Sequence, residues 1–198
     1  MRVFVGIDLD DGIRSGIVRF MEDIRPLAPE ARWISPESLH VTLKFIGEKP
    51  EHTVQEIEAA LRQVECDAVQ VALRGCGFFP TAKAARVFWI GIQSANLVAL
   101  ARAVENQLAA VAIPREERAY SPHLTLARAS GGSGAPGWRK GDKPNRQFGR
   151  LQEVLAESPS PDFGTMSARE FFLYKSELGR GGARYTKIAQ FLSRTRDR

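Results

Sequence analysis

The chain contains the segment SLHVTLKFIGE at residues 38–48 and a related segment, YSPHLTLARAS, at residues 120–130. Each segment holds a His, any residue, a Thr and an aliphatic residue, within an apolar run typical of a strand. Because side chains alternate across a strand, a His and a Thr two positions apart lie on one face. The sequence therefore predicts two matched imidazole and hydroxyl pairs: His40 with Thr42, and His123 with Thr125.

The two pairs have the side-chain types that attack on a phosphodiester requires. Two imidazoles with near-neutral pKa values can act as a general acid and a general base in one site. The two hydroxyls suit the non-bridging oxygens of a phosphate. One copy alone would more often be an ordinary hydrogen-bonded pair of strand residues, so the prediction depends on the repetition. The pattern predicts hydrolysis that uses neither a metal nor a cofactor.

The repetition extends beyond the two motifs. The tripeptide RVF opens two apolar strands, at residues 2–4 and 86–88, which are 84 residues apart, and the two motif histidines are 83 apart. Apolar residues at helical spacing follow each opening strand, over residues 10–25 and 97–111. The chain therefore has two copies of a unit made of a strand, a helix and a His-bearing strand.

The remaining elements surround these units. We expect a helix at 51–65, a strand at 68–79, a helix at 148–157 and a closing hairpin of strands 169–178 and 183–192. Residues 130–146 contain five Gly and two Pro, which predicts a mobile loop. Cationic residues surround Trp138 in this loop, and a ring among cations suits single-stranded nucleic acid. Trp138 is thus a candidate substrate contact, although a solvated insertion explains the loop equally well.

Composition limits the class of protein. The 198 residues, 43% hydrophobic and 26% charged, predict one two-lobed domain over residues 1–198 with no membrane-spanning run. The N-terminal apolar stretch is too short and too quickly acidic for a signal peptide, so we expect a cytoplasmic protein. The net charge of +5 favours an anionic partner. Cys66 and Cys76 lack His or Cys neighbours at metal spacing, so neither a zinc site nor a disulfide framework is predicted.

Three features together carry a resemblance: the paired motifs, the opening strand RVFVGIDL and the closing segment LYKSELGRGGARY. The chain resembles the two-histidine phosphoesterases, and within them the RNA 2′,3′-cyclic phosphodiesterases first described as 2′-5′ RNA ligases. The resemblance covers essentially the whole chain except residues 130–146. It implies an α+β fold in which two antiparallel sheets, backed by helices, are related by a pseudo-twofold axis around a central cleft.

The resemblance also implies a role for each motif residue. His40 would donate a proton to the leaving 3′ oxygen, and His123 would accept a proton from the attacking water. Thr42 and Thr125 would bind the phosphate oxygens. The substrate would be RNA ending in a 2′,3′-cyclic phosphate, the product a 2′-phosphate, and the reverse reaction a 2′-5′ ligation. The family pattern implies no cofactor and no metal, and we expect a monomer.

Three further residues are candidates near the motifs. Arg128 matches an arginine common in the family, but strict alternation places it on the face opposite His123, so contact with a nucleotide requires the strand to end or bulge. Lys44 shares the face of His40 by alternation and is a candidate substrate contact. Tyr185 matches the closing family segment, but a hairpin tyrosine is expected to pack rather than bind.

Several alternatives remain. Asp8-Leu9-Asp10 follows an apolar strand, as in haloacid-dehalogenase-type phosphatases, but no downstream Lys and Asp motifs are placed convincingly, and helix capping accounts for these acids. A serine hydrolase is disfavoured because no G-x-S-x-G occurs. The motifs do not separate an RNA end from 2′-5′ oligoadenylate or another small phosphodiester. A non-catalytic RNA-binding module is also possible, although binding alone does not need two imidazoles.

Overall fold

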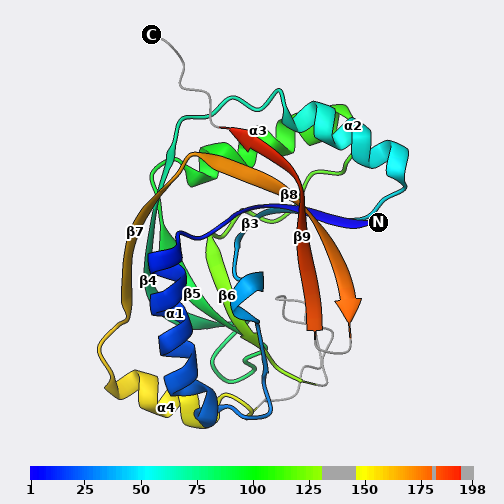
Figure 1. Cartoon of the computed structure of the whole chain (residues 1–198). Helices are drawn as coiled ribbons and strands as arrows, with labels where there is room; N and C mark the ends of the chain where they lie inside the picture. The colour runs from blue at the N-terminus through cyan, green and yellow to red at the C-terminus, as the bar shows by residue number, and fades with distance from the viewer. Residues whose placement is uncertain (131–145, 180–181, 193–198) are drawn as a thin grey trace.

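The computed structural model describes residues 1–130, 146–179 and 182–192, in which the strands form two antiparallel sheets (Figure 1). The first sheet has the order β3 (Val41–Glu48), β1 (Arg2–Ile7), β8 (Glu170–Gly179) and β9 (Gly182–Leu192). The second has the order β2 (Arg32–Trp33), β6 (His123–Arg128), β5 (Val87–Gln93), β4 (Val69–Phe79) and β7 (Asp162–Ala168). Each motif therefore lies on a different sheet.

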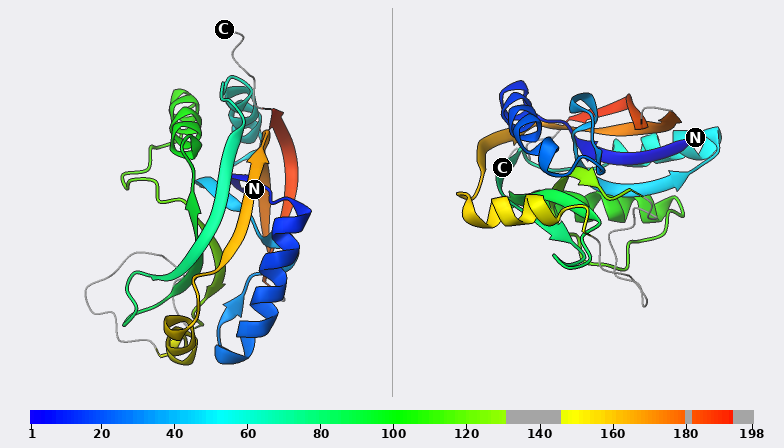
Figure 2. Two further views of the ribbon diagram at one scale, coloured as in Figure 1. Left: turned by 90° about the vertical axis from the view of Figure 1, so that its left-hand side faces the viewer. Right: turned by 90° about the horizontal axis from the view of Figure 1, so that it is seen from below.

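Helices cover the sheets at their ends and sides. They are α1 (Asp11–Ile24), α2 (Glu51–Leu61), α3 (Leu97–Ala110) and α4 (Gly149–Glu157), with short 3₁₀ turns η1 (Arg25–Leu27) and η2 (Pro36–Ser38). α2 packs on α3 at one end of the molecule and α1 packs on β7, while α4 lies at the opposite end (Figures 1 and 2). No helix in the described ranges is both long and apolar enough to span a membrane.

One cluster of buried apolar side chains lies between the two sheets. It includes Val5 of β1, Ile17 of α1, Phe88 of β5 and Leu108 of α3. A smaller aromatic cluster of Phe4, Phe172 and Tyr174 lies on the other face of the first sheet, with Tyr185 packed against it. The first sheet is thus covered by the core on one face and by aromatic rings on the other, and His40 lies on the aromatic face.

The α+β fold with two antiparallel sheets is confirmed, and two strands were not predicted. β2 is only two residues long, and β7 begins after Pro161 and contains Gly164 at φ +94°. Both Pro and Gly weaken a strand pattern, so pairing with β4 rather than local propensity makes β7 a strand. Asp10 occupies the N-cap position of α1, but its side chain makes no capping hydrogen bond, contrary to our expectation. Trp138 and most of the loop predicted at 130–146 lie outside the described residues.

The pairing registers set the internal repeat at 83 residues. Gly6 of β1 pairs with Thr42, and Trp89 of β5 pairs with Thr125. The RVF tripeptides, 84 residues apart, are therefore out of structural register by one position. Phe4 lies among the rings beside His40, whereas Phe88 is fully buried in the core, as Val5 is. The two halves are duplicated, but the correspondence follows the motifs rather than the tripeptides.

Candidate active site

Both motif histidines have the same hydrogen bond. Nδ1 of His40 lies 2.7 Å from the carbonyl oxygen of Ser38, and Nδ1 of His123 lies 2.8 Å from that of Ser121. A carbonyl oxygen only accepts hydrogen bonds, so in each ring Nδ1 donates its proton. This bond leaves Nε2 as the nitrogen available for proton transfer in the neutral imidazole. The chain thus sets the same tautomer twice, each time with the carbonyl two residues before the histidine.

Aromatic packing shields both half-buried imidazoles from part of the solvent. The His40 ring lies 4.6 Å from the ring centroid of Phe4 and 5.0 Å from that of Tyr185, and the His123 ring lies 5.2 Å from that of Phe79. Burial lowers the pKa of His40 to about 4, against the opposing effect of the bond to the Ser38 carbonyl. Burial also lowers the pKa of His123. Near neutral pH the unliganded protein therefore holds both imidazoles mainly in the uncharged form.

The threonines of the motifs lie on the histidine faces of their strands. Thr42 and Thr125 are both half-buried, and each lies opposite a residue of the neighbouring strand, Gly6 or Trp89. The Tyr120 hydroxyl donates to the Thr42 carbonyl at 2.9 Å. This bond holds the chain just ahead of the second motif against β3, and so brings the two half-sites together.

Each motif strand has a bulge directly after its threonine. In the β1–β3 ladder the register skips Leu43, and in the β5–β6 ladder it skips Leu126. A bulge adds one residue to one strand and so reverses the alternation beyond it. Beyond the bulge in each strand, the residues on the histidine face are therefore the ones that strict alternation places on the opposite face.

The bulge makes the prediction for Lys44 wrong. Lys44 pairs with Val5 and points to the core face, where its side chain is only 5% exposed. Its Nζ lies 2.7 Å from Oε1 of Glu105 on α3 and donates to the carbonyl of Pro114 at 2.8 Å. Lys44 therefore fastens β3 to α3 and is not a candidate for substrate contact.

The corresponding bulge in β6 returns Arg128 to the histidine face. Arg128 pairs with Val87 at the end of β6, and its positive charge lowers the pKa of both His40 and His123. Burial lowers the pKa of Arg128 itself, and the nearby Tyr185 opposes this. The bulge that contact with a nucleotide requires is thus present, and the guanidinium lies within electrostatic range of both imidazoles.

Phe45 of β3 is the counterpart of Arg128 of β6, 83 residues earlier in the chain. It pairs with Phe4 on the aromatic face, with a ring distance of 6.0 Å, and is 61% exposed. An exposed aromatic ring can stack on a nucleobase. Strict alternation places Phe45 on the face opposite His40. A sequence signal for the bulge at Leu43 would have been needed to predict Phe45 as a residue of the histidine face.

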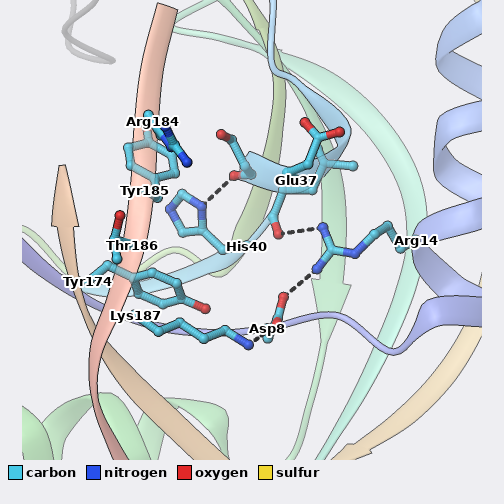
Figure 3. A pocket seen from close by; sticks show the side chains of 11 residues that line it. Asp8, Arg14, Glu37, His40, Tyr174, Arg184, Tyr185, Thr186 and Lys187 are labelled. Carbon is cyan, nitrogen blue, oxygen red and sulfur yellow. Dashed lines mark hydrogen bonds and ion pairs between the residues drawn. The ribbon is translucent and has the colours of Figure 1, made fainter. Parts of the chain in front are cut away.

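A pocket lies beside His40, between α1, η2 and the β8–β9 hairpin (Figure 3). Asp8 binds Arg14 through one carboxylate oxygen and Lys187 through the other. Burial raises the pKa of the Asp8 carboxyl. The hydrogen bonds from Lys187 and the Leu9 N–H and the charge of Arg14 outweigh burial and hold this pKa below its usual value. The Asp8 carboxylate thus serves a cation network. In the part of the chain that the structure describes, no group of three His, Cys, Asp or Glu side chains could hold a metal ion.

Comparison with known proteins identifies the family. The model of the LigT-like phosphoesterases matches residues 7–89. The RNA 2′,3′-cyclic phosphodiesterase of Methanothermobacter thermautotrophicus is 31% identical over 194 residues, which cover 96% of this chain and 98% of that protein. The chain belongs to the LigT-like phosphoesterase family. A protein of the same name from Archaeoglobus fulgidus is 29% identical over 192 residues, covering 96% of this chain and 99% of that protein.

The fold of this LigT-like phosphoesterase is also that of solved structures. A crystal structure of a Thermus thermophilus protein has a TM-score of 0.76 and 27% identity, covering 99% of this chain and 100% of that one. The resemblance inferred from the two motifs and the flanking strands is confirmed. Within the fold, Arg128 lies close enough to His40 and His123 for its charge to lower the pKa of each.

Proposed function

We propose that the protein hydrolyses RNA ends that carry a 2′,3′-cyclic phosphate and leaves a 2′-phosphate. The names of the relatives support this substrate. The observation that carries the proposal is the duplicated half-site: each motif histidine donates from Nδ1 to the carbonyl two residues earlier, which leaves its Nε2 for chemistry. Binding alone does not need two such imidazoles, so the duplication favours catalysis over a purely RNA-binding role.

In the proposed reaction, Nε2 of His123 takes a proton from water as the water oxygen attacks the phosphorus. Protonated His40 gives its proton to O3′ as the P–O3′ bond breaks, and O2′ keeps the phosphate. Thr42 and Thr125 donate to the non-bridging oxygens, and the Arg128 guanidinium balances the negative charge that develops there. All of these groups belong to the chain, and the proposal uses no metal and no cofactor.

The lowered pKa of His123 suits its role as a base, whereas the lowered pKa of His40 opposes its role as an acid. With a pKa of about 4, almost no His40 carries the proton that a general acid must donate near neutral pH in the free protein. A bound phosphate anion raises the pKa of an adjacent imidazole, and we propose that the substrate itself provides the charge that protonates His40. The family resemblance supports this order of roles.

A change of leaving group tests the assignment of His40 as the acid and His123 as the base. An aryl phosphodiester whose phenolate leaves without a proton needs no general acid. We expect His40→Ala to recover most of its lost rate on such a substrate, and His123→Ala to stay impaired. Recovery by His123→Ala instead would reverse the roles.

The function itself is tested on an RNA oligonucleotide with a 2′,3′-cyclic phosphate end, in the presence of a chelator. We expect a 2′-phosphate product and a loss of turnover in His40→Ala and His123→Ala, with folding checked by thermal unfolding. Release of a 3′-phosphate would contradict the assigned leaving group. A requirement for magnesium would favour the phosphatase interpretation of Asp8.

Three further expectations remain part of the proposal. Hydrolysis run in reverse is a 2′-5′ ligation, which RNA with a 5′-hydroxyl and a partner with a cyclic phosphate end would detect. A cytoplasmic location is tested by cell fractionation, and a monomer by light scattering. The candidate contact Trp138 is tested by Trp138→Ala, which should weaken binding of RNA more than binding of a mononucleotide.

A further inference from the structure

The pocket beside His40 takes no part in the proton transfers of the proposed reaction. It has a volume of about 360 Å³, and its walls come from Asp8, α1, η2 and the β8–β9 hairpin (Figure 3). His40 and Tyr185 border it, so the pocket begins at the catalytic ring itself. A ligand group bound in this pocket would therefore lie next to the leaving oxygen, O3′, that His40 protonates in the proposed reaction.

The charges in the pocket favour an anion. Three cations, Arg14, Arg184 and Lys187, face two acids, Asp8 and Glu37, which leaves one net positive charge while His40 is neutral. Asp8 holds Arg14 and Lys187 from opposite sides, so both cations are positioned before any ligand arrives. Positioned cations bind phosphate oxygens with charge-assisted hydrogen bonds.

An unused donor lies in the wall of the same pocket. The Tyr174 hydroxyl is buried and has no hydrogen-bond partner among the described residues, and Tyr174 as a whole is 5% exposed. Its ring stacks on Phe4 at 4.9 Å, which fixes its position. Burial raises the pKa of Tyr174, so the hydroxyl keeps its proton. A buried donor without a partner is costly unless a ligand or a water satisfies it.

The inference that follows rests on the proposed function. If His40 serves O3′, the ribose of the terminal nucleotide lies on the His40 side of the phosphate. The next charged group along the RNA is then the 5′-phosphate of that nucleotide, one sugar away. We propose that the pocket binds this 5′-phosphate, which in RNA is the phosphodiester to the preceding nucleotide. The pocket would thereby distinguish an RNA end from a free 2′,3′-cyclic nucleoside phosphate.

The test compares two substrates that differ by one phosphate: adenosine 2′,3′-cyclic phosphate with and without a 5′-phosphate. We expect kcat/KM to be about tenfold higher with the 5′-phosphate, which corresponds to about 1.4 kcal/mol. Equal values of kcat/KM for the two substrates would overturn the proposal and leave the proposed function standing.

Variants of the charged residues test whether the pocket causes the preference for the substrate with a 5′-phosphate. Lys187→Gln and Arg184→Gln should each lower the preference to about threefold, as the loss of one exposed charge contact predicts. Glu37→Gln removes a negative charge from the same pocket and should raise the preference. The matched control is Lys175→Gln on β8, because Lys175 lies outside the pocket and pairs with Glu177 at 2.7 Å. A preference changed as much by Lys175→Gln as by Lys187→Gln would contradict the assignment.

Binding separates failure of this inference from failure of the proposed function. Calorimetry with adenosine 2′,5′-bisphosphate and adenosine 2′-phosphate requires no turnover. We expect the bisphosphate to bind about tenfold more tightly, and Lys187→Gln to reduce that difference. A protein that shows this difference but hydrolyses neither cyclic nucleotide nor the RNA oligonucleotide with a cyclic phosphate end would support the pocket and contradict the function. Equal affinities would overturn the pocket, whatever the hydrolysis assay shows.

Discussion

The low pKa of His40 makes a quantitative prediction about folding. In the unfolded chain the imidazole has a pKa of 6.5, and in the folded protein the pKa is about 4. Between these values the unfolded state binds a proton that the folded state does not. The free energy of unfolding should therefore fall as the pH decreases from about 6.5 towards 4, and become constant below 4.

The perturbation is His40→Asn, which keeps a polar side chain of similar size and removes the titration. Linkage gives a cost of about 2.5 kcal/mol for wild type at pH 4.5, relative to pH 7. His40 is only half-buried, so screening by water reduces the expected cost to about 2 kcal/mol. Other titrating groups are present in both proteins, so the difference between them isolates His40.

The assay is urea unfolding of both proteins at pH 7 and at pH 4.5. We expect wild type to lose about 2 kcal/mol more than His40→Asn over this interval. A difference below about 0.5 kcal/mol would refute the buried, neutral His40 that the aromatic packing indicates. Proton NMR titration of the His40 ring gives the folded pKa independently.

The remaining predictions concern catalysis and packing. Because the pKa values of both histidines lie below 6.5, kcat/KM should fall about tenfold per pH unit above that pH; a flat profile from pH 6.5 to 8 would contradict paired acid-base catalysis. Arg128→Ala should lower kcat/KM about 100-fold and move the falling limb to higher pH, whereas Arg128→Lys keeps the charge and should leave the limb in place. Phe45→Ala should raise KM for RNA about tenfold with little change in thermal stability, and Phe45→Trp should restore binding. Lys44→Met should destabilise the protein by about 2 kcal/mol by leaving Glu105 unpaired, and Lys44→Met with Glu105→Gln should recover most of that loss in urea unfolding.

Sequence pattern was sufficient to predict the strand positions of the two motifs. No bulge separates His123 from Thr125 in β6, or Val41 from Thr42 at the start of β3, which directly follows His40, so the expected shared faces follow from the period of a strand. The family resemblance came from the same residues and the strands around them.

The predictions failed where tertiary pairing changes the period. The bulges at Leu43 and Leu126 exist only because β1 and β5 pair with the motif strands in a shifted register. They turned Lys44 to the core and brought Phe45 and Arg128 to the site. Likewise, Asp8, which follows β1, pairs with Arg14 of α1 and Lys187 of β9, and no local pattern connects these residues. Long-range contacts of this kind are invisible in a single sequence.

The central claim is that two equivalent histidines transfer protons in unequal roles during cyclic-phosphate hydrolysis. Product analysis on an RNA oligonucleotide with a 2′,3′-cyclic phosphate end tests it most directly, with wild type, His40→Ala and His123→Ala compared in the presence of a chelator. The account predicts a 2′-phosphate from wild type and turnover lost in each variant. Wild-type turnover by either variant, or a 3′-phosphate product, would contradict it.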